Sequence, residues 1–199
     1  MMGLIRRVFS YLSPDMFKLL YPAFVRSHLE YAQAAWSPRY KSLTDKIEQV
    51  KKRATQQVDG LRHLDYSDRL KFLDMPTLKY RRYRGDMIEL WKHFNQYNVE
   101  LLPTTFKPLG RPSRRHSRQL CLHRPVDGVY GVQRNSFYYR TAPIWNDLPS
   151  EVAEATSLNS FKNRLDNHWN NQDFKFDHLK PPSQPTHGQN PNYHQGSAA

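Results

Sequence analysis

The chain has 199 residues, a formal net charge of +12 and a hydrophobic fraction of 38%. Its single cysteine, Cys121, excludes an intrachain disulfide and is typical of a reducing compartment. The longest apolar run, residues 19–25, is interrupted by Pro22 and is far shorter than the roughly 20 residues of a membrane-spanning helix. We therefore expect a protein of the cytoplasm or nucleus with no membrane partner.

A first helix is predicted from Ser13, because Ser13-Pro14-Asp15 supplies an N-cap, a first-turn proline and an acid near the helix dipole. Pro22 should kink or split this helix, and residues 36–38 should end it. His28 is expected to be a hydrogen-bonded core histidine, since it lies on the apolar face. That face is predicted to comprise Phe17, Leu20, Tyr21, Phe24, His28, Tyr31, Ala32 and Ala35.

A second helix is predicted over residues 43–58, closed by Gly60 in a left-handed conformation. Its apolar stripe is expected to contain Leu43, Ile47, Val50, Ala54 and Val58. The opposite, polar side is expected to carry Lys46, Gln49, Lys52, Arg53 and Gln56.

A short helix capped by Ser67 should turn Leu70 and Leu73 inward, and the strongest helical pattern follows from Thr77 to residue 97. The buried face of this long helix is predicted to contain Tyr80, Tyr83, Met87, Leu90, Trp91 and Phe94. Arg82 and His93 should point away from that face. Arg84 falls inside the stripe and should either reach out to solvent or pair with an acid.

The remainder of the chain changes character several times. Prolines and glycines exclude long helices between residues 103 and 135, where a hairpin around residues 126–128 is only weakly indicated. Ser157 should cap a last helix whose apolar side contains Leu158, Phe161, Leu165 and Trp169. From Asn170 onward the composition predicts a disordered tail.

The positive charge suggests a polyanionic partner, although a basic surface that only maintains solubility is an alternative. Residues 101–135 carry seven Lys or Arg against one acidic residue. Candidate contacts to the backbone of RNA or an RNA–DNA hybrid, without sequence readout, fall in three clusters: Lys51, Lys52 and Arg53; Lys79, Arg81 and Arg82; and Arg111, Arg114, Arg115 and Arg118. The third is favoured because basic residues in a loop have no packing role.

Two tyrosines beside the second cluster allow a further interpretation. Tyr80 and Tyr83 are candidates for stacking on exposed bases, but their place on the apolar stripe favours a core position.

Catalytic chemistry is not indicated. No two acidic residues are adjacent, whereas two-metal catalysis of nucleotide transfer depends on clustered carboxylates. His116, Cys121 and His123 are too few for a zinc site, and no Gly-x-Ser-x-Gly motif frames a nucleophile. We expect no enzyme activity, no metal and no cofactor.

Three blocks of sequence carry a family resemblance: LYPAFVRSHLEYAQAAWSP (20–38), RATQQVDGLRHLDYSDRLKFLDMPTLKYRRYRGDMIELWKHF (53–94) and NSFYYRTAPIWNDLPSEVAEATSLNSFKNRLDNHW (135–169). In this order they resemble the region after the catalytic palm in reverse transcriptases of LINE-type (non-LTR) retrotransposons, the jockey-like group. The resemblance implies a helical thumb that holds primer and template, followed by a connector. It also implies a fragment that lacks the catalytic palm.

The expected fold is mainly α: a helical thumb-like bundle over residues 1–100, an irregular basic connector over 101–135, a W-N-x-L-P segment with a C-terminal helix over 136–169, and a disordered tail over 170–199. The first functional hypothesis is a non-catalytic retrotransposon fragment that binds nucleic acid. The alternatives are a protein-interaction module, with a polymerase palm in trans as partner, and a non-functional relic that exposes a former polymerase interface.

Overall fold

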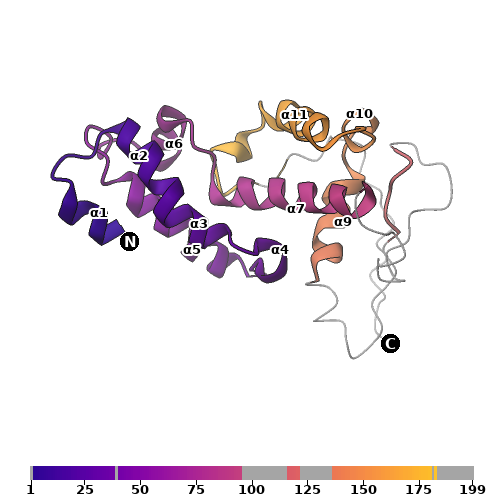
Figure 1. The fold of residues 1–199 in the computed structure, drawn as a ribbon, viewed down its shortest axis with the longest axis horizontal. Coiled ribbons are helices and arrows are strands. Elements are labelled where there is room, and N and C mark those ends of the chain that lie inside the picture. Colours follow the sequence, from indigo (N-terminus) through magenta and orange to yellow (C-terminus); the bar gives the residue numbers. More distant parts are fainter. Residues whose placement is uncertain (1, 39, 96–115, 122–135, 181, 183–199) are drawn as a thin grey trace, which may run out of the picture.

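The computed structural model describes residues 2–38, 40–95, 116–121, 136–180 and 182. As predicted, the protein is mainly helical, and these described residues form no β-strand. The molecule is elongated, with the N-terminal helices at one end, α9, α10 and α11 at the other, and the long helix α7 joining them (Figure 1). Within this described part, no helix is both long enough and apolar enough to cross a membrane.

The first predicted helix is present but divided. It consists of α2 (Pro14–Tyr21), a π-helical turn η1 (Pro22–Arg26), α3 (Ser27–Glu30) and α4 (Gln33–Trp36), and it is preceded by α1 (Met2–Val8). The Ser13 hydroxyl accepts a hydrogen bond from the Met16 amide at 3.2 Å, which confirms the predicted cap. A π-helical turn begins at Pro22, where the sequence predicted a kink or a split, and the helical run is first broken at Ala32, which has φ 48°.

The predicted apolar face of this segment is wrong beyond the proline. Phe24 and Tyr31 are 49% and 79% exposed, and His28 is exposed and not a core histidine. The physical reason is the π-helical turn, whose i→i+5 hydrogen bonds accommodate an extra residue and rotate the next helical turns relative to α2. Val25 is buried in this turn.

Helix α5 (Lys41–Thr55) occupies the predicted second position, and its predicted apolar stripe is only partly correct. Ala54 and Val58 are buried as predicted, and Ile47 is partly buried. Leu43 and Val50 are exposed, whereas Glu48 and Lys51 are buried. Glu48 faces inward because its carboxylate accepts hydrogen bonds from the Tyr66 hydroxyl at 2.5 Å and from the amides of Leu78 and Lys79 at 3.1 and 3.2 Å. Those two amides begin α7, where a helix leaves its N–H groups without partners and favours negative charge.

The next two helices agree closely with the prediction. Helix α6 (Tyr66–Leu73) buries Leu70 and Leu73, although Asp65 and not Ser67 precedes its first residue. Helix α7 (Leu78–Asn95) is capped by Thr77, whose hydroxyl accepts from the Tyr80 amide at 3.0 Å. Gly60 takes the predicted positive φ of 80°, but in the turn after α5 and not directly at the helix end.

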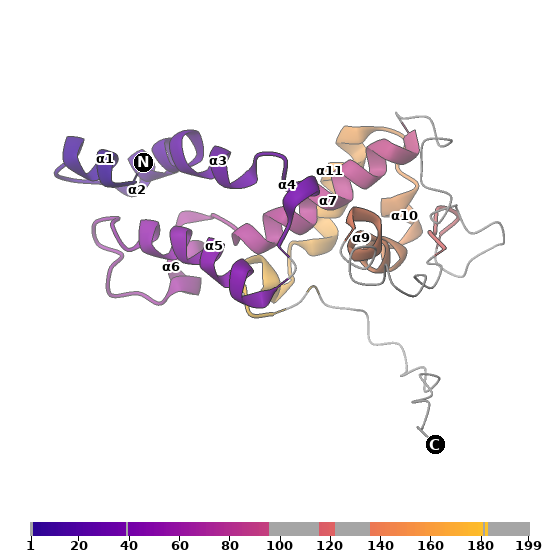
Figure 2. The same cartoon turned by 90° about the horizontal axis from the view of Figure 1, so that it is seen from below.

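Two separate cores result. The first core lies between α1, α2, η1, α5 and α6, with α2 and α3 along one side and α5 and α6 along the other (Figure 2). Its members are Ile5, Leu12, Phe17, Tyr21, Val25, Ala54, Val58, Leu61, Tyr66, Leu70, Leu73 and Met75.

The second core lies between α7, α9 (Phe137–Asn146), α10 (Ser150–Ala153) and α11 (Leu158–Trp169). Trp145 is fully buried and stacks on Phe94 with ring centroids 5.2 Å apart. The Ser157 hydroxyl accepts from the Ser160 amide at 3.2 Å, which confirms the predicted cap of α11. Because α7 contributes to this core, the N-terminal helices and the helices after residue 136 are packed against each other through α7.

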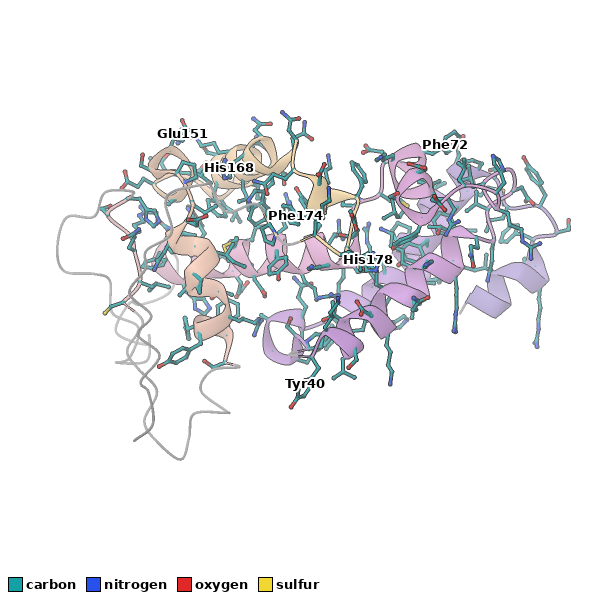
Figure 3. The ribbon with its side chains drawn as sticks, turned by 180° about the vertical axis from the view of Figure 1, so that it is seen from behind. Tyr40, Phe72, Glu151, His168, Phe174 and His178 are labelled. Carbon is teal, nitrogen blue, oxygen red and sulfur yellow. The ribbon has the colours of Figure 1, made fainter. Side chains whose placement is uncertain are left out.

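The ordered chain extends past residue 169, where the sequence placed the start of the tail. The 3₁₀-helix η4 (Asp173–Lys175) buries Phe174, whose ring centroid lies 5.1 Å from that of Tyr80 (Figure 3). The Thr77 amide also donates to the Lys175 carbonyl at 2.9 Å. The predicted boundary is therefore wrong for residues 170–180. Residues 183–199 and the predicted turn at 126–128 lie outside the described residues.

Candidate nucleic-acid interface

The first basic cluster separates into inner and outer members. Lys51 is fully buried, and its ammonium donates to the Met75 carbonyl at 3.3 Å and to the Pro76 carbonyl. Burial lowers the pKa of Lys51 to about 7, although the Glu48 carboxylate opposes the shift. The prediction that Lys51 contacts a phosphate is therefore wrong. Lys52 is half-buried and Arg53 is exposed, so both remain candidates.

The side chains of the second basic cluster form hydrogen bonds and ion pairs with other parts of the protein. Lys79 donates to the carbonyls of His178 and Lys180 at 2.9 and 3.0 Å. Arg81 forms an ion pair with Glu30, with Nη2 and Oε2 2.9 Å apart. These two cations are therefore already engaged.

The remaining arginines of α7 are also turned toward the protein. Arg84 forms two hydrogen bonds with the Asp166 carboxylate, at 2.6 and 2.7 Å, so the predicted acidic partner is confirmed. Arg82 is only 6% exposed, and the prediction that it points away from the buried face is wrong. This cluster therefore presents no open row of charges to a nucleic acid.

The third cluster is described only at its end. Arg111, Arg114 and Arg115 lie outside the described residues. Arg118 is half-buried, donates to the Ala153 carbonyl at 3.2 Å and accepts a hydrogen bond from the Trp145 indole at 2.7 Å through its own carbonyl. Arg118 is thus held against the second core.

The two candidate stacking residues belong to the second core. Tyr80 is buried against Trp169 and Phe174. Tyr83 is partly buried beside the same Phe174 ring, at a centroid distance of 6.4 Å. The core position favoured by the sequence is confirmed for both.

A basic surface does remain on the outward side of α5. We define the α5 basic face as a set of five exposed residues: Lys46, Gln49, Arg53, Gln56 and Arg62. The sequence predicted the first four as the polar side of the helix but missed Arg62, which lies after the Gly60 turn. Arg53, Gln56 and Arg62 line one depression of about 630 Å³ with Asp59 as its acidic member.

The cations of this face are not neutralised by acidic side chains in the described ranges. Lys46, Arg53 and Arg62 form no ion pair with any residue of the described ranges. Lys46 and Arg53 are seven residues apart, so they are spaced by ~10 Å along the helix axis. Within the described residues, the helix therefore places two unpaired positive charges along its outward side.

Exposed apolar side chains are concentrated in the same half of the molecule. Tyr40 and Phe72 are 60% and 59% exposed, and both point outward in Figure 3. The large apolar side chains that are exposed in the described residues up to position 75 include Val8, Tyr11, Leu19, Phe24, Tyr31, Trp36, Tyr40, Leu43, Val50 and Phe72. Single exposed apolar residues are ordinary, and this half of the molecule has more of them than the other half.

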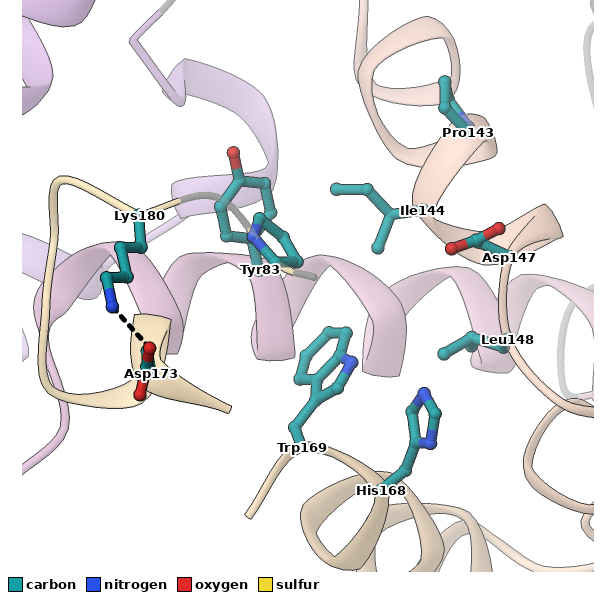
Figure 4. Close-up of a pocket in the computed structure, with 10 residues that line it drawn as sticks. Tyr83, Pro143, Ile144, Asp147, Leu148, His168, Trp169, Asp173 and Lys180 are labelled. Carbon is teal, nitrogen blue, oxygen red and sulfur yellow. Dashed lines mark hydrogen bonds and ion pairs between the residues drawn. The ribbon is translucent and has the colours of Figure 1, made fainter. Parts of the chain in front are cut away.

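The second half contains a pocket of about 610 Å³ beside α7 (Figure 4). Its wall is formed by Tyr83, Ile144, Leu148 and Trp169, and an ion pair between Asp173 and Lys180 lies at its edge. His168 and Asp147 also line it. No group of three His, Cys, Asp or Glu in the described part of the chain is placed to hold a metal ion.

The residues considered as metal ligands have other surroundings. His116 is buried, and its Nε2 lies 3.0 Å from the Trp145 carbonyl. Cys121 is a half-buried free thiol, and His123 lies outside the described residues. No protein-family model, curated protein or solved structure matches this chain.

Proposed function

We propose that this protein binds the backbone of RNA or of an RNA–DNA hybrid through the α5 basic face, without catalysis and without reading sequence. In this proposal the chain is the thumb-like part of a LINE-type reverse transcriptase, and a palm that carries the metal-binding aspartates would be a separate partner. The resemblance of the three sequence blocks supports the second statement. The charge distribution supports the first.

One contrast between α7 and α5 carries the proposal. Lys79, Arg81 and Arg84 of α7 are engaged by carbonyls or acids, and Arg82 is buried. By contrast, Lys46, Arg53 and Arg62 are exposed and have no ion-pair partner within the described ranges. A cation of this kind can displace counterions from a phosphate on binding, which favours association. An engaged cation would first have to lose its internal partner.

The test is a salt series with a labelled RNA–DNA hybrid. Wild type is compared with the triple variant Lys46→Ala, Arg53→Ala, Arg62→Ala. Each phosphate contact removed should lower the slope of log affinity against log salt by about 0.9, so the triple variant should bind more weakly and show a clearly flatter slope.

A matched control removes the same charge elsewhere. Lys18, Lys162 and Arg164 are also cations without an acidic partner in the described part, and they lie off α5. Their triple alanine variant should bind nearly as wild type. Equal loss in both triple variants would mean that only net charge acts, and the α5 assignment would be wrong.

The connector predicted from the sequence is tested with a separate variant. The variant with Arg111, Arg114, Arg115 and Arg118 all changed to alanine tests whether the loop adds phosphate contacts. If this variant alone loses binding, the interface lies in the connector and not on α5.

The exposed apolar surface favours a second candidate function, association with another protein. The partner in this case would be the polymerase palm supplied in trans, which the resemblance implies. Binding through apolar contacts would persist at high salt, in contrast to phosphate contacts. Sedimentation at low and high salt, alone and with a palm domain of this retrotransposon group, separates the two functions.

A further inference from the structure

Arg82 is a buried cation without a hydrogen-bonding partner among the described residues. It extends from α7 and is 6% exposed. Its Nη2 is buried and has no hydrogen-bond partner among the described residues. A guanidinium stays charged under ordinary conditions, and the nearby carboxylates of Glu48 and Asp86 favour that charge. Neither carboxylate forms an ion pair with Arg82 in the described residues, so its hydrogen-bond donors would be completed only by a further anion.

The side chain lies at the wall of a pocket of about 480 Å³. The pocket is formed by the start of α5, the first half of α7, α9 and the C-terminal residues His178 and Leu179. Lys79 holds that C-terminal segment in place through its bonds to the carbonyls of His178 and Lys180. The segment that composition assigned to a tail therefore completes the pocket.

Positive charge exceeds negative charge in this pocket. Four cations line it, Lys41, Lys79, Arg82 and Arg140, against two carboxylates, Asp45 and Asp86. Arg140 is satisfied by Asp86, at 3.0 Å between Nη2 and Oδ1, and by the Ala34 carbonyl at 2.7 Å. Asp86 is thus committed to Arg140.

Two further features matter for a ligand. The exposed Lys41 at the pocket mouth has no ion-pair partner in the described ranges. Tyr83 and Ile144 line this pocket and also the aromatic pocket of Figure 4, so the two pockets adjoin along these side chains.

We propose that this pocket binds a phosphate group, with Arg82 as its principal ligand and Lys41 as a second cation. A guanidinium offers planar, paired donors that match phosphate oxygens. The adjoining wall of Tyr83 and Ile144 leaves room for the organic part of a phosphate ester. The phosphate comes either from a small molecule or from the end of a nucleic acid strand, and its binding here is independent of the α5 basic face.

The experiment measures thermal unfolding of the full chain while inorganic phosphate is titrated at constant ionic strength. Phosphate should raise the Tm of wild type with a saturable concentration dependence, since a ligand that binds only the folded state stabilises it. In Arg82→Gln the dissociation constant should rise at least about tenfold, as expected for losing hydrogen bonds to a charged group. Lys18→Gln removes an equal charge outside the pocket and should respond as wild type.

The ligand-free proteins provide a second readout. Because Arg82 forms no ion pair in the described ranges, Arg82→Gln should unfold at the same Tm as wild type or higher when phosphate is absent. A markedly lower Tm together with an unchanged phosphate response would show that Arg82 has a structural role, and would overturn the proposal. Equal phosphate responses in wild type and Arg82→Gln would overturn it as well.

The source of the phosphate is separated by two oligonucleotides. A short strand with a 5′-phosphate is compared with the same strand bearing a 5′-hydroxyl, in wild type and in Arg82→Gln. A preference for the phosphorylated strand that disappears in the variant assigns the pocket to strand ends. If inorganic phosphate binds but the strand shows no preference, the ligand is a small phosphorylated molecule.

Discussion

The two cores differ in the side chains that they bury, and this difference distinguishes a half with exposed apolar and basic residues from a half with an aromatic interior. The second core encloses aromatic rings such as Trp145 and Phe161, which pack with centroids 5.9 Å apart. The first core encloses fewer rings and places Glu48 and Lys51 inside, while Leu43 and Val50 on the same helix face outward. The N-terminal half thus keeps apolar and basic side chains available for partners, whereas the other half turns its large side chains inward.

The largest effect is expected in the second core. Trp145→Ala removes a fully buried ring that stacks on Phe94 and donates to the Arg118 carbonyl. The free energy of unfolding should fall by ~3–5 kcal/mol, measured by urea denaturation. Phe72→Ala, at a 59% exposed position, is the control and should change it by less than ~0.5 kcal/mol.

In the first core, the largest loss of stability is expected on removal of the buried Glu48 carboxylate. Glu48→Ala strands the Tyr66 hydroxyl and the amides of Leu78 and Lys79, and should cost about 3 kcal/mol. Glu48→Gln keeps an acceptor and should cost less. If Glu48→Ala were as stable as wild type, the polar interior of the first core would not be a stabilising feature.

Lys51 makes the first core sensitive to pH. Its pKa is about 7 in the folded protein and 10.5 for the ordinary side chain, so between these values the unfolded chain binds more protons. Stability contributed by this group therefore rises as the pH increases from 7 toward 10. In urea denaturation, the free energy of unfolding should increase more from pH 7 to pH 9 for wild type than for Lys51→Met. Equal increases would contradict the lowered pKa of Lys51.

A smaller effect is expected for the ion pair between α7 and α11. Arg84 and Asp166 are partly exposed, so their two-hydrogen-bond contact should contribute about 1 kcal/mol or less. A double-mutant cycle with Arg84→Ala and Asp166→Ala measures the coupling. Its coupling energy should decrease at high salt, and a salt-independent value would show that packing and not charge is responsible.

The smallest stability effect is expected on the apolar surface of the first half. The triple variant Phe24→Ser, Tyr31→Ser, Leu43→Ser should change unfolding free energy by less than about 1 kcal/mol in total, because these side chains are 43–79% exposed. It should instead weaken the salt-resistant association with a palm domain, measured by sedimentation. A collapse in stability would mean that these residues support the fold and do not form an interaction surface.

Local signals explain which parts of the fold were predictable from sequence. Thr77 and Ser157 act within a few residues of themselves, so the starts of α7 and α11 can be predicted from the sequence. The burial of Glu48 in α5 cannot be predicted in this way, because its three hydrogen-bond partners lie 18, 30 and 31 positions away. Periodicity therefore predicted Leu43 and Val50 to be buried, whereas Glu48 is buried because it caps the first amides of α7.

Of the candidate site residues, one could be predicted from its own helix and another could not. The exposure of Arg53 is expected from its place on the polar side of a helix. The burial of Arg82 depends on α9 and on residues 178–179, which reach α7 from almost one hundred positions away. No pattern within one helix carries that information.

The most direct test of the difference between the two halves is amide hydrogen exchange of the protein, free and saturated with an RNA–DNA hybrid. We expect binding to slow exchange in α5 and in the turn over residues 60–62, and to leave α11 unchanged. Slower exchange confined to α11, or binding that leaves α5 unaffected, would contradict the assignment of the nucleic-acid surface to the N-terminal half.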